Sequence, residues 1–389
     1  MNWEEYKLSE ICEIRGGKRL PANHVLTDEK TSHPYVKARD IRGGKINCNN
    51  LQFVSDETYE FIKRYIVDEG DVCITIVANI GDVGIVPKFL HKANLTENAV
   101  RLTNFDKESD SKFINLLLSQ SSYKNYMELM AAGAAQAKLG IYKIEQIKIT
   151  LPPLPVQRRI AEILGRYDTL IENYTAQIRR LEAAAQNLYA EWFVRGRCPF
   201  AEYETGAKLP VGWEIVKLGD VLELRYGKSL IEEIRDGGKY PVVGSSGIVD
   251  YHSQFLVGKA GIVVGRKGNV GSVYWIDKPF FPIDTAFYVE SEMSLHYLFF
   301  NLQTQNFISG DAAVPGLNRE QALSNKMIKP SDDVLEKFDE ITTPIFYKTS
   351  NLQTQITKLH RMRDKLLPRL LSGKLPVKVS ESEKLSLQI

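Results

Sequence analysis

The sequence has few cysteines, no long apolar run and almost no net charge. Its four cysteines lie far apart and include no CxxC pair, which argues against both a disulfide framework and a zinc site. No stretch of about 18 uninterrupted apolar residues occurs, so a membrane-spanning helix is not expected. The acidic start lacks a basic segment followed by an apolar one, so we expect no secretory signal and a cytoplasmic location.

The charge of the chain is nearly balanced, and its size exceeds that of one hydrophobic core. The 50 Lys and Arg residues against 48 Asp and Glu residues give a formal net charge of +2. Any binding to nucleic acid must therefore use local basic patches. A length of 389 residues predicts two or three domains, and the 43% hydrophobic content predicts that they are folded.

The most informative feature is that the sequence repeats itself. Residues 3–18 (WEEYKLSEICEIRGGK) and 213–228 (WEIVKLGDVLELRYGK) are identical at eight of sixteen positions without a gap. A shorter echo relates residues 79–83 to 269–273. A repeat fixes the architecture, so the chain is predicted to contain two diverged copies of one unit, each with mixed secondary structure followed by a long helix.

The predicted long helices carry a heptad pattern. Residues 160–193 match 338–371 at seven of 34 positions. Ten positions from Ile160 to Trp192, at alternating steps of four and three, are all apolar or aromatic, which is typical of a coiled-coil seam. The simplest arrangement packs the two helices on each other as an antiparallel pair, and the alternative is two amphipathic helices on separate cores. The predicted seam residues are Ile160, Leu164, Ile171, Ile178, Leu181, Leu188, Leu352, Ile356, Leu359 and Leu366.

Breaks are expected at matching points of the two helices. Gly165-Arg166 aligns with Thr343-Pro344, and proline suits a helix start or a kink. We therefore predict a short leading helix followed by a longer one in each copy. At about 1.5 Å per residue, the longer helix over residues 167–193 would measure about 40 Å.

The remaining segments mix strand and helix patterns, so the fold class is predicted as α+β. Residues 72–77 and 261–264 are β-rich runs that end in turn residues, whereas 113–130 and 295–307 have helical periodicity. Short connectors that contain proline precede both long helices. The predicted domains are two mixed α/β domains at residues 1–150 and 197–330, a central helical spacer at 151–196, and a C-terminal helical spacer and tail at 331–389.

A search for catalytic or cofactor-binding motifs finds none that is complete. Gly227-Lys228-Ser229 has the end of a phosphate loop, but Leu222 stands where its first glycine is required. The glycines of residues 265–271 favour a tight hairpin, although the basic pair at its tip leaves a ligand role open. The six histidines show no metal-binding spacing. The chain is therefore predicted to be a binding protein without a catalytic or metal site.

Local charge indicates where a ligand would bind. Residues 15–45 hold eight Lys or Arg residues against three acids, and they include the glycine pairs Gly16-Gly17 and Gly43-Gly44. Glycine pairs predict loops that approach a ligand closely, and Arg, Lys, Asn and Ser side chains can meet phosphates and base edges. The alternative is a solvated basic face. Matching turns in the second copy carry the same residue types.

Three motifs stand at the junctions of the repeat. They are Trp-Glu-x-x-Lys-Leu at Trp3 and Trp213, Leu-Pro-Pro-Leu-Pro-Val-Gln-Arg-Arg at 151–159, and Leu-Leu-Pro-Arg-Leu-Leu-Ser-Gly-Lys-Leu at 366–375. In this order the chain resembles the specificity (S) subunits of type I restriction-modification systems over nearly its whole length. The second connector departs from the family pattern, because Ser-Asp-Asp at 331–333 replaces the Pro-Leu-Pro run.

The resemblance implies two target-recognition domains in a pseudo-two-fold arrangement, separated by an antiparallel pair of long helices. Each domain would read one half-site of double-stranded DNA, and the helices would set the distance between the two halves of an asymmetric target. Such subunits have no catalytic centre. They bind methyltransferase subunits, here expected to number two, which carry S-adenosylmethionine. They also bind restriction subunits, which carry ATP- and Mg-dependent translocation and cleavage.

With this resemblance, the basic and polar turn residues become candidate DNA contacts. They are Lys18, Arg19, Lys37, Arg39, Arg42, Lys45 and Asn79 in the first copy, and Lys228, Ser229, Ser245, Ser246, Arg266, Lys267 and Asn269 in the second. Two other functions stay open from the sequence. One is a fused enzyme with its own nuclease or methylase centre, and the other is a protein-only scaffold that uses the coiled coil for assembly.

Overall fold

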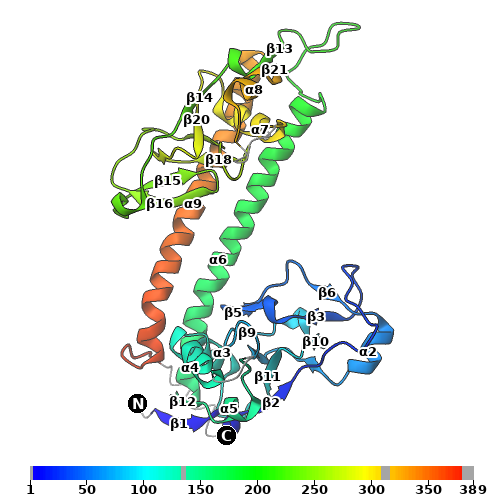
Figure 1. Cartoon of the computed structure of the whole chain (residues 1–389), viewed down its shortest axis with the longest axis vertical. Coiled ribbons are helices and arrows are strands. Elements are labelled where there is room, and N and C mark those ends of the chain that lie inside the picture. The colour runs from blue at the N-terminus through cyan, green and yellow to red at the C-terminus, as the bar shows by residue number, and fades with distance from the viewer. Residues whose placement is uncertain (1–2, 133–136, 308–315, 379–389) are drawn as a thin grey trace. The chain divides into compact units, whose positions relative to one another are not determined.

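The computed structural model describes residues 3–132, 137–307 and 316–378. It forms two compact units (Figure 1). Unit 1 consists of residues 1–169 and 360–389, and unit 2 consists of residues 170–359. Both long helices contribute residues to both units. The units therefore differ from the predicted ranges, which set the helices apart as separate spacers.

Unit 1 mixes short strands with short helices ahead of the first long helix. Its elements are, in chain order, β1 (Glu4–Lys7), α1 (Leu8–Ile11), β2 (Glu13–Gly16), β3 (Pro34–Val36), η1 (Ala38–Asp40), β4 (Ile41–Arg42), β5 (Gly44–Ile46), β6 (Gln52–Phe53), α2 (Asp56–Ile62), β7 (Ile66–Val67), β8 (Val72–Thr75), β9 (Val83–Ile85), η2 (Lys88–Leu90), β10 (Ala93–Leu95), β11 (Ala99–Thr103), α3 (Ser111–Leu118), α4 (Ser121–Ala131), α5 (Ile141–Glu145) and β12 (Lys148–Leu151).

Three sheets organise unit 1, with the strand orders β1-β12, β6-β3-β10-β7 and β2-β11-β8-β9-β5-β4. All four residues of β8, in the largest sheet, are buried. Val72 and Ile74 belong to the same core cluster as Phe113 of α3, whereas Cys73 belongs to a second cluster with Val36. The β-rich run is therefore apolar throughout because both faces of this strand are covered.

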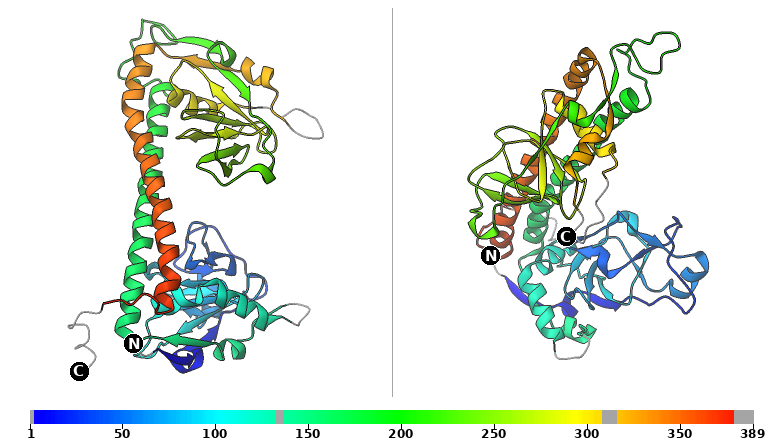
Figure 2. Two further views of the ribbon diagram at one scale, coloured as in Figure 1. Left: turned by 90° about the vertical axis from the view of Figure 1, so that its left-hand side faces the viewer. Right: turned by 45° about the horizontal axis from the view of Figure 1, so that its top comes forward.

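Unit 2 repeats this plan with fewer strands. Its short elements are β13 (Glu214–Lys217), η4 (Leu218–Asp220), β14 (Glu223–Tyr226), η5 (Glu232–Ile234), β15 (Tyr240–Gly244), β16 (Gly247–His252), β17 (Gly261–Gly265), β18 (Val273–Ile276), β19 (Phe281–Pro282), β20 (Ala286–Glu290), α7 (Leu295–Thr304), α8 (Arg319–Ser324) and β21 (Lys326–Lys329). The strand orders are β13-β21, β14-β20-β17-β18 and β16-β15-β19. These sheets lie to one side of the part of the helix pair that belongs to unit 2 (Figure 2).

Most strands of unit 1 have a counterpart in unit 2, which confirms the predicted repeat and the α+β class. β1 pairs antiparallel with β12, and β13 pairs antiparallel with β21. The order β2-β11-β8-β9 in unit 1 matches β14-β20-β17-β18 in unit 2. The parallel pair β3–β10 likewise matches β15–β19. The largest sheet of unit 1 then continues with β5 and β4.

Each copy ends in one uninterrupted helix, so the predicted breaks are wrong. α6 spans Leu154–Tyr189, with a π-helical turn after it, and α9 spans Asp332–Leu371. Around Pro344, Phe338 is fully buried and Phe346 packs against the same core cluster. Packing on both sides of the proline offsets the backbone hydrogen bond that proline removes from a helix.

Another predicted helix is divided in the structure. The segment 113–130, predicted as one helix, forms α3 and α4 with a break at Ser119-Gln120. The Ser119 hydroxyl donates a hydrogen bond of 2.6 Å to the carbonyl of Asn115 inside the helix. Serine side chains that bond to the backbone compete with helix propagation. The helix therefore ends there although the apolar pattern continues.

The predicted seam residues lie in three buried regions. In the middle, Ile171, Ile178, Leu352 and Ile356 form one cluster within unit 2. Leu181 and Leu359 pack against this cluster. The remaining seam residues join the cores of the two units, with Ile160, Leu164 and Leu366 in unit 1 and Leu188 in unit 2. Within unit 2 the two helices therefore pack directly on each other.

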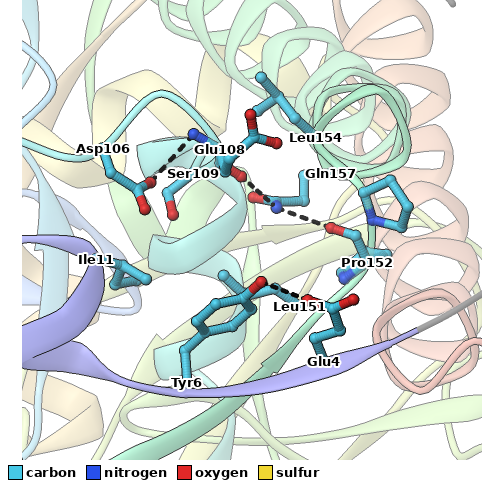
Figure 3. A pocket seen from close by; sticks show the side chains of 11 residues that line it. Glu4, Tyr6, Ile11, Asp106, Glu108, Ser109, Leu151, Pro152, Leu154 and Gln157 are labelled. Atoms are coloured by element: carbon cyan, nitrogen blue, oxygen red, sulfur yellow. Dashed lines mark hydrogen bonds between the residues drawn. The ribbon is translucent and has the colours of Figure 1, made fainter.

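A buried glutamine fixes the start of α6 to unit 1 (Figure 3). The Gln157 side chain is 1% exposed. Its Nε2 atom donates to the carbonyls of Glu108 at 2.9 Å and Pro152 at 2.8 Å, and its Oε1 accepts from the Asp110 amide at 3.0 Å. One side chain thus joins the proline connector, the loop before α3 and the helix. This is the structural role of the glutamine in the sequence motif.

Replacing Gly165 by alanine is expected to stabilise unit 1. Gly165 lies inside α6, and a Cβ atom added there would meet nothing within 4 Å. Alanine in a helix interior is favoured over glycine by about 0.5–1 kcal/mol, and urea unfolding followed in unit 1 should show a gain of this size. Gly17→Ala is the contrasting variant, because its Cβ would lie 2.0 Å from the Thr96 carbonyl oxygen. A Gly165→Ala chain that unfolds at lower urea would contradict the expectation.

Candidate nucleic-acid interface

In both units a glycine allows the chain to cross closely over a neighbouring segment. The Gly17 amide donates to Ala99 and the Gly227 amide donates to Ala286, both at 3.1 Å. A Cβ atom at Gly227 would lie 2.2 Å from the Ile283 carbonyl oxygen, as close a clash as the one at Gly17. The sequence Gly-Lys after β2 and β14 thus reflects backbone approach rather than a phosphate loop.

The lysine after each of these glycines occupies an equivalent position. The Lys18 amide donates to the Leu95 carbonyl at 2.9 Å, and the Lys228 amide donates to the Pro282 carbonyl at 3.0 Å. Both side chains are exposed. The residues 95–99 and 282–286 are therefore matching segments, and we call them the central segments of units 1 and 2.

A second turn is also duplicated beside each central segment. It joins β8 to β9 and β17 to β18, as expected for a hairpin at residues 265–271. Ala78 and Gly268 both have positive φ, at 63° and 80°. An alanine in this region is strained, and such strain is often found at functional sites. The turns present the exposed residues Asn79 and Asn269 at matching positions.

In unit 2 the structure brings the predicted contacts together around the central segment. The amides of Arg266 and Lys267 donate to the Thr285 carbonyl at 2.9 and 3.1 Å. The Ser245 amide donates to the Thr285 hydroxyl at 3.3 Å. The Ser272 hydroxyl donates to the carbonyls of Ser245 at 2.6 Å and of Asn269 at 2.8 Å, which joins the two turns. Ser229 and Ser246 follow directly in sequence after Lys228 and Ser245, and both are exposed.

Arg266 contacts two aromatic rings and a backbone carbonyl. Its guanidinium carbon lies 4.9 Å from the centre of the Tyr226 ring and 5.9 Å from that of Phe287. Its Nη1 atom donates to the Asp284 carbonyl at 3.0 Å. A guanidinium held over aromatic rings loses less freedom on binding, and its remaining N–H groups suit the O6 and N7 atoms of guanine.

In unit 1 the predicted contacts fall into two groups. Lys18, Arg19, Lys37 and Asn79 surround the central segment. Arg19 Nε pairs with Glu97 at 3.0 Å, and Lys37 Nζ donates to the Gln52 side chain at 2.9 Å. Lys37 directly follows Val36, whose carbonyl accepts from the Thr96 amide at 3.1 Å. Arg39 is exposed on η1, close to Lys37 in sequence.

Arg42 and Lys45 lie elsewhere in unit 1. They belong to β4 and β5, at the edge of the six-stranded sheet opposite to β2, which precedes Lys18. Lys45 Nζ lies 4.0 Å from the Asp168 carboxylate of α6. Sequence proximity therefore grouped these two residues with Lys18 although the sheet separates them.

An acidic residue accompanies the cations of unit 1. Burial alone would raise the pKa of Glu97, but hydrogen bonds from Arg19, its own amide and Thr96 lower it below the usual value. Glu97 therefore stays ionised at neutral pH beside Arg19. A carboxylate here repels phosphates, so Arg19 must exchange this partner in order to contact DNA.

Sequence reasoning missed two residues of these surfaces. Lys138 is exposed and forms an isolated β-bridge with Val77, the counterpart of the bridge between Lys267 and Gly316. Tyr226 supports Arg266 and is 52% exposed. Tyr226 aligns with Gly16 in the repeat, so the aromatic residue is specific to the second copy. The sequence therefore offered one signal for Tyr226, namely an aromatic residue where the first copy has glycine.

Metal and membrane sites are not seen in the described part of the chain. Among residues 3–132, 137–307 and 316–378, no group of three His, Cys, Asp or Glu side chains is placed to hold a metal ion. Within the same residues, no helix has both the length and the apolar character needed to cross a bilayer.

Comparison with known proteins identifies the family. The model for the type I restriction modification DNA specificity domain matches residues 1–183 and again residues 210–356. This chain belongs to that family. The two matches cover the two copies of the repeat, so the duplicated surfaces described above lie in DNA specificity domains. The family is defined by DNA specificity, which confirms the expectation of a non-catalytic recognition subunit.

Individual relatives agree with this family over most of the chain. The type I restriction enzyme MjaIX specificity subunit of Methanocaldococcus jannaschii is 25% identical, with 97% of this chain and 94% of the relative covered. The putative MjaX specificity subunit of the same organism is 29% identical over 73% of this chain and 64% of that protein. The crystal structure of the S subunit from M. genitalium has the same fold, with a TM-score of 0.66 and 18% identity over 95% and 96% of the two chains.

Proposed function

We propose that this chain directs a type I restriction-modification complex to a bipartite DNA target in which each unit reads one half-site. The observation that carries the proposal is that the two central segments have the same backbone surroundings but different side chains. Ile76 and Arg266 are equivalent, since their amides donate to Asn98 and Thr285 at matching positions. Two surfaces of one shape with different chemistry would read two different sequences, so the target would be asymmetric.

The long helices would set the gap between the half-sites. α6 and α9 each contribute residues to both units, and both are continuous. A continuous helix has a fixed rise of about 1.5 Å per residue, so its length limits the distances available to whatever it joins. The bases between the half-sites would not be read.

Catalysis in this proposal belongs to partner subunits. Two methyltransferase subunits would supply S-adenosylmethionine and the methyl transfer, and restriction subunits would use ATP and Mg. This chain would bind no cofactor of its own. The assignment of catalysis to partner subunits is supported by the family membership of this chain. It is also supported by the relatives, which are named as specificity subunits of type I restriction enzymes.

The proposal is tested by substitution of the unit 2 cations. Arg266→Ala is expected to relax one base position of one half-site, with a loss of about 1–3 kcal/mol against the preferred sequence. Lys267→Ala is expected to weaken binding to all sequences alike and to reduce the salt dependence, because lysine contacts phosphates as a point charge. Selection of bound duplexes from a random pool by the chain with its methyltransferase subunit measures both effects.

Unit 1 supplies the matched control. Lys18→Ala is expected to lower affinity without any change in the half-site that responds to Arg266→Ala. If Arg266→Ala and Lys267→Ala reduced binding equally for every sequence, Arg266 would not be a base reader. If purified chain methylated or cut DNA without other subunits, the assignment of catalysis to partners would be wrong.

A further inference from the structure

Unit 2 contains a groove whose position in unit 1 is occupied by the chain itself. The groove has a cavity volume of about 480 Å³ and is lined by β16, β18, α7 and the unit 2 parts of α6 and α9. Its wall is largely apolar and aromatic, with Tyr274, Trp275, Phe299 and Phe346 among its residues. Both its size and its composition are typical of a binding site.

The sheets show which element is missing from unit 2. In unit 1, β9 pairs in parallel with β5, through Gly44 with Gly84 and Lys45 with Ile85. β18, the counterpart of β9, is the last strand of its sheet in the described part of unit 2. The sequence explains the difference, because residues 37–51 separate β3 from β6, whereas only Ser245-Ser246 separates β15 from β16.

The helices α3 and α7, which lie beside these sheets, also show that the groove of unit 2 takes the place of β5. In unit 1 the Asn115 Nδ2 atom of α3 donates to the Gly44 carbonyl of β5 at 2.9 Å. The caps of α3 and α7 align Asp110 with Ser294, since each accepts from the amide three residues later. By this alignment, Phe299 is the counterpart of Asn115. Phe299 lines the groove, so the surface that holds β5 in unit 1 is the wall of the groove in unit 2.

The long helices give a third indication that the groove of unit 2 corresponds to the position of β5 in unit 1. Lys45 of β5 lies 4.0 Å from Asp168 of α6. The repeat of 178 residues that relates α6 to α9 makes Phe346 the counterpart of Asp168. Phe346 lines the groove. The three elements that contact β5 in unit 1 are β9, α3 and α6, and their counterparts β18, α7 and α9 all line the groove in unit 2.

The groove has three polar features that bear on which occupant fits it. The Glu182 side chain of α6 lines the groove and is exposed. Partial burial raises its pKa above the usual value and is the only cause of the shift, so no described cation offsets its charge. A cation bound in the groove would do so. Thr349 Oγ1 is buried without a hydrogen-bond partner. β18 also has a free edge of backbone donors and acceptors among the described residues, and such an edge is a template for another strand.

We propose that the groove of unit 2 binds an extended segment of a protein partner, which adds a strand to β18 as β5 adds to β9. The segment runs parallel to β18 and places an apolar side chain against Phe346 and Phe299. It places a basic side chain near Glu182. Main-chain hydrogen bonds supply the affinity and the two side chains supply the selectivity. The negative charge of Glu182 disfavours nucleic acid in the same place.

A peptide that copies the natural occupant of unit 1 tests this proposal on the full chain. The probe is a synthetic peptide of residues 40–47, which contains β5 together with the paired strand β4. It carries Lys45→Leu, so that an apolar side chain of β5 faces Phe346, and Arg42 of β4 supplies the cation. At ten times its Kd, the peptide is expected to slow amide exchange in β18 by about tenfold. Glu182→Lys in the chain is expected to weaken the peptide about tenfold, and Arg42→Glu in the peptide should have a similar effect.

Glu336→Lys is the matched control, because Glu336 is exposed on α9 of unit 2 and does not line the groove. It should leave peptide binding unchanged. Unaltered exchange in β18 at about 1 mM peptide, or equal effects of Glu182→Lys and Glu336→Lys, would overturn the proposal. A chain that sediments as a dimer and loses the dimer with Glu182→Lys would show that a second copy fills the groove instead of a partner.

Discussion

Insertion of one heptad into each long helix is expected to lengthen the gap between the two half-sites by about 3 base pairs. The insertions duplicate residues 172–178 after Ile178 and residues 350–356 after Ile356, which repeats the apolar pattern of the cluster between α6 and α9. Seven residues add about 10 Å to a helix, and one base pair spans about 3.4 Å along DNA. Whole heptads keep the seam facing the partner helix. Methylation mapping in cells that express the variant with its methyltransferase subunit measures the gap.

The control places the same seven residues in the loop between α6 and β13. Residues 199–208 of this loop contain no helix or strand, so the insertion lengthens the chain without lengthening either helix. The target should then stay unchanged. An unchanged gap after insertion into the helices, in a protein that still methylates DNA, would refute the role of the helices in spacing.

Replacement of Asp71 by alanine is expected to destabilise unit 1 by about 3 kcal/mol, near the low end of the cost of breaking a buried ion pair. Arg101 Nη1 lies 2.8 Å from the Asp71 carboxylate, and the two side chains are 10% and 6% exposed. Alanine leaves the Arg101 charge in a buried site. Asp68 stays 3.1 Å from Arg101 and offsets part of the loss of the Asp71 charge. It does not offset all of it, because the Asp68 side chain is 45% exposed and its charge is screened by water. Urea unfolding followed by amide exchange in β8 and β11 isolates the effect in unit 1.

Two further variants distinguish charge from packing at this pair. Asp71→Leu with Arg101→Met replaces both charges by apolar groups and should recover most of the lost stability. Glu5→Ala removes one partner of the exposed pair Lys148–Glu5 and should leave the urea midpoint unchanged. Equal effects of Asp71→Ala and Glu5→Ala would show that burial of the pair does not matter.

Much of the fold was predictable because it depends on local patterns. The repeat beginning at Trp3 and Trp213 gave two copies of one unit, and the matching strand pairs of the structure confirm this. The heptad pattern gave the long helices. The breaks at Gly165 and Pro344 were wrong, since glycine and proline weaken a helix locally while distant packing decides whether it continues.

The candidate site was predictable only in part, for the same reason. Lys18 and Lys228 were found because Gly-Lys recurs in the repeat, and the structure places both beside the central segments. Arg42 and Lys45 were grouped with Lys18 by sequence distance, although a sheet lies between them. Lys138 was missed because it approaches Val77 from far along the chain.

The sequence by itself determined the duplication, the alternation of mixed units with long helices, and the family. These features follow from residue patterns that each segment carries alone. Only the tertiary structure decided which turns meet around residues 95–99 and 282–286, and that a strand present in unit 1 is absent beside β18. Such facts depend on contacts between segments that are distant in sequence, and no local pattern encodes where the backbone of one segment will lie against another.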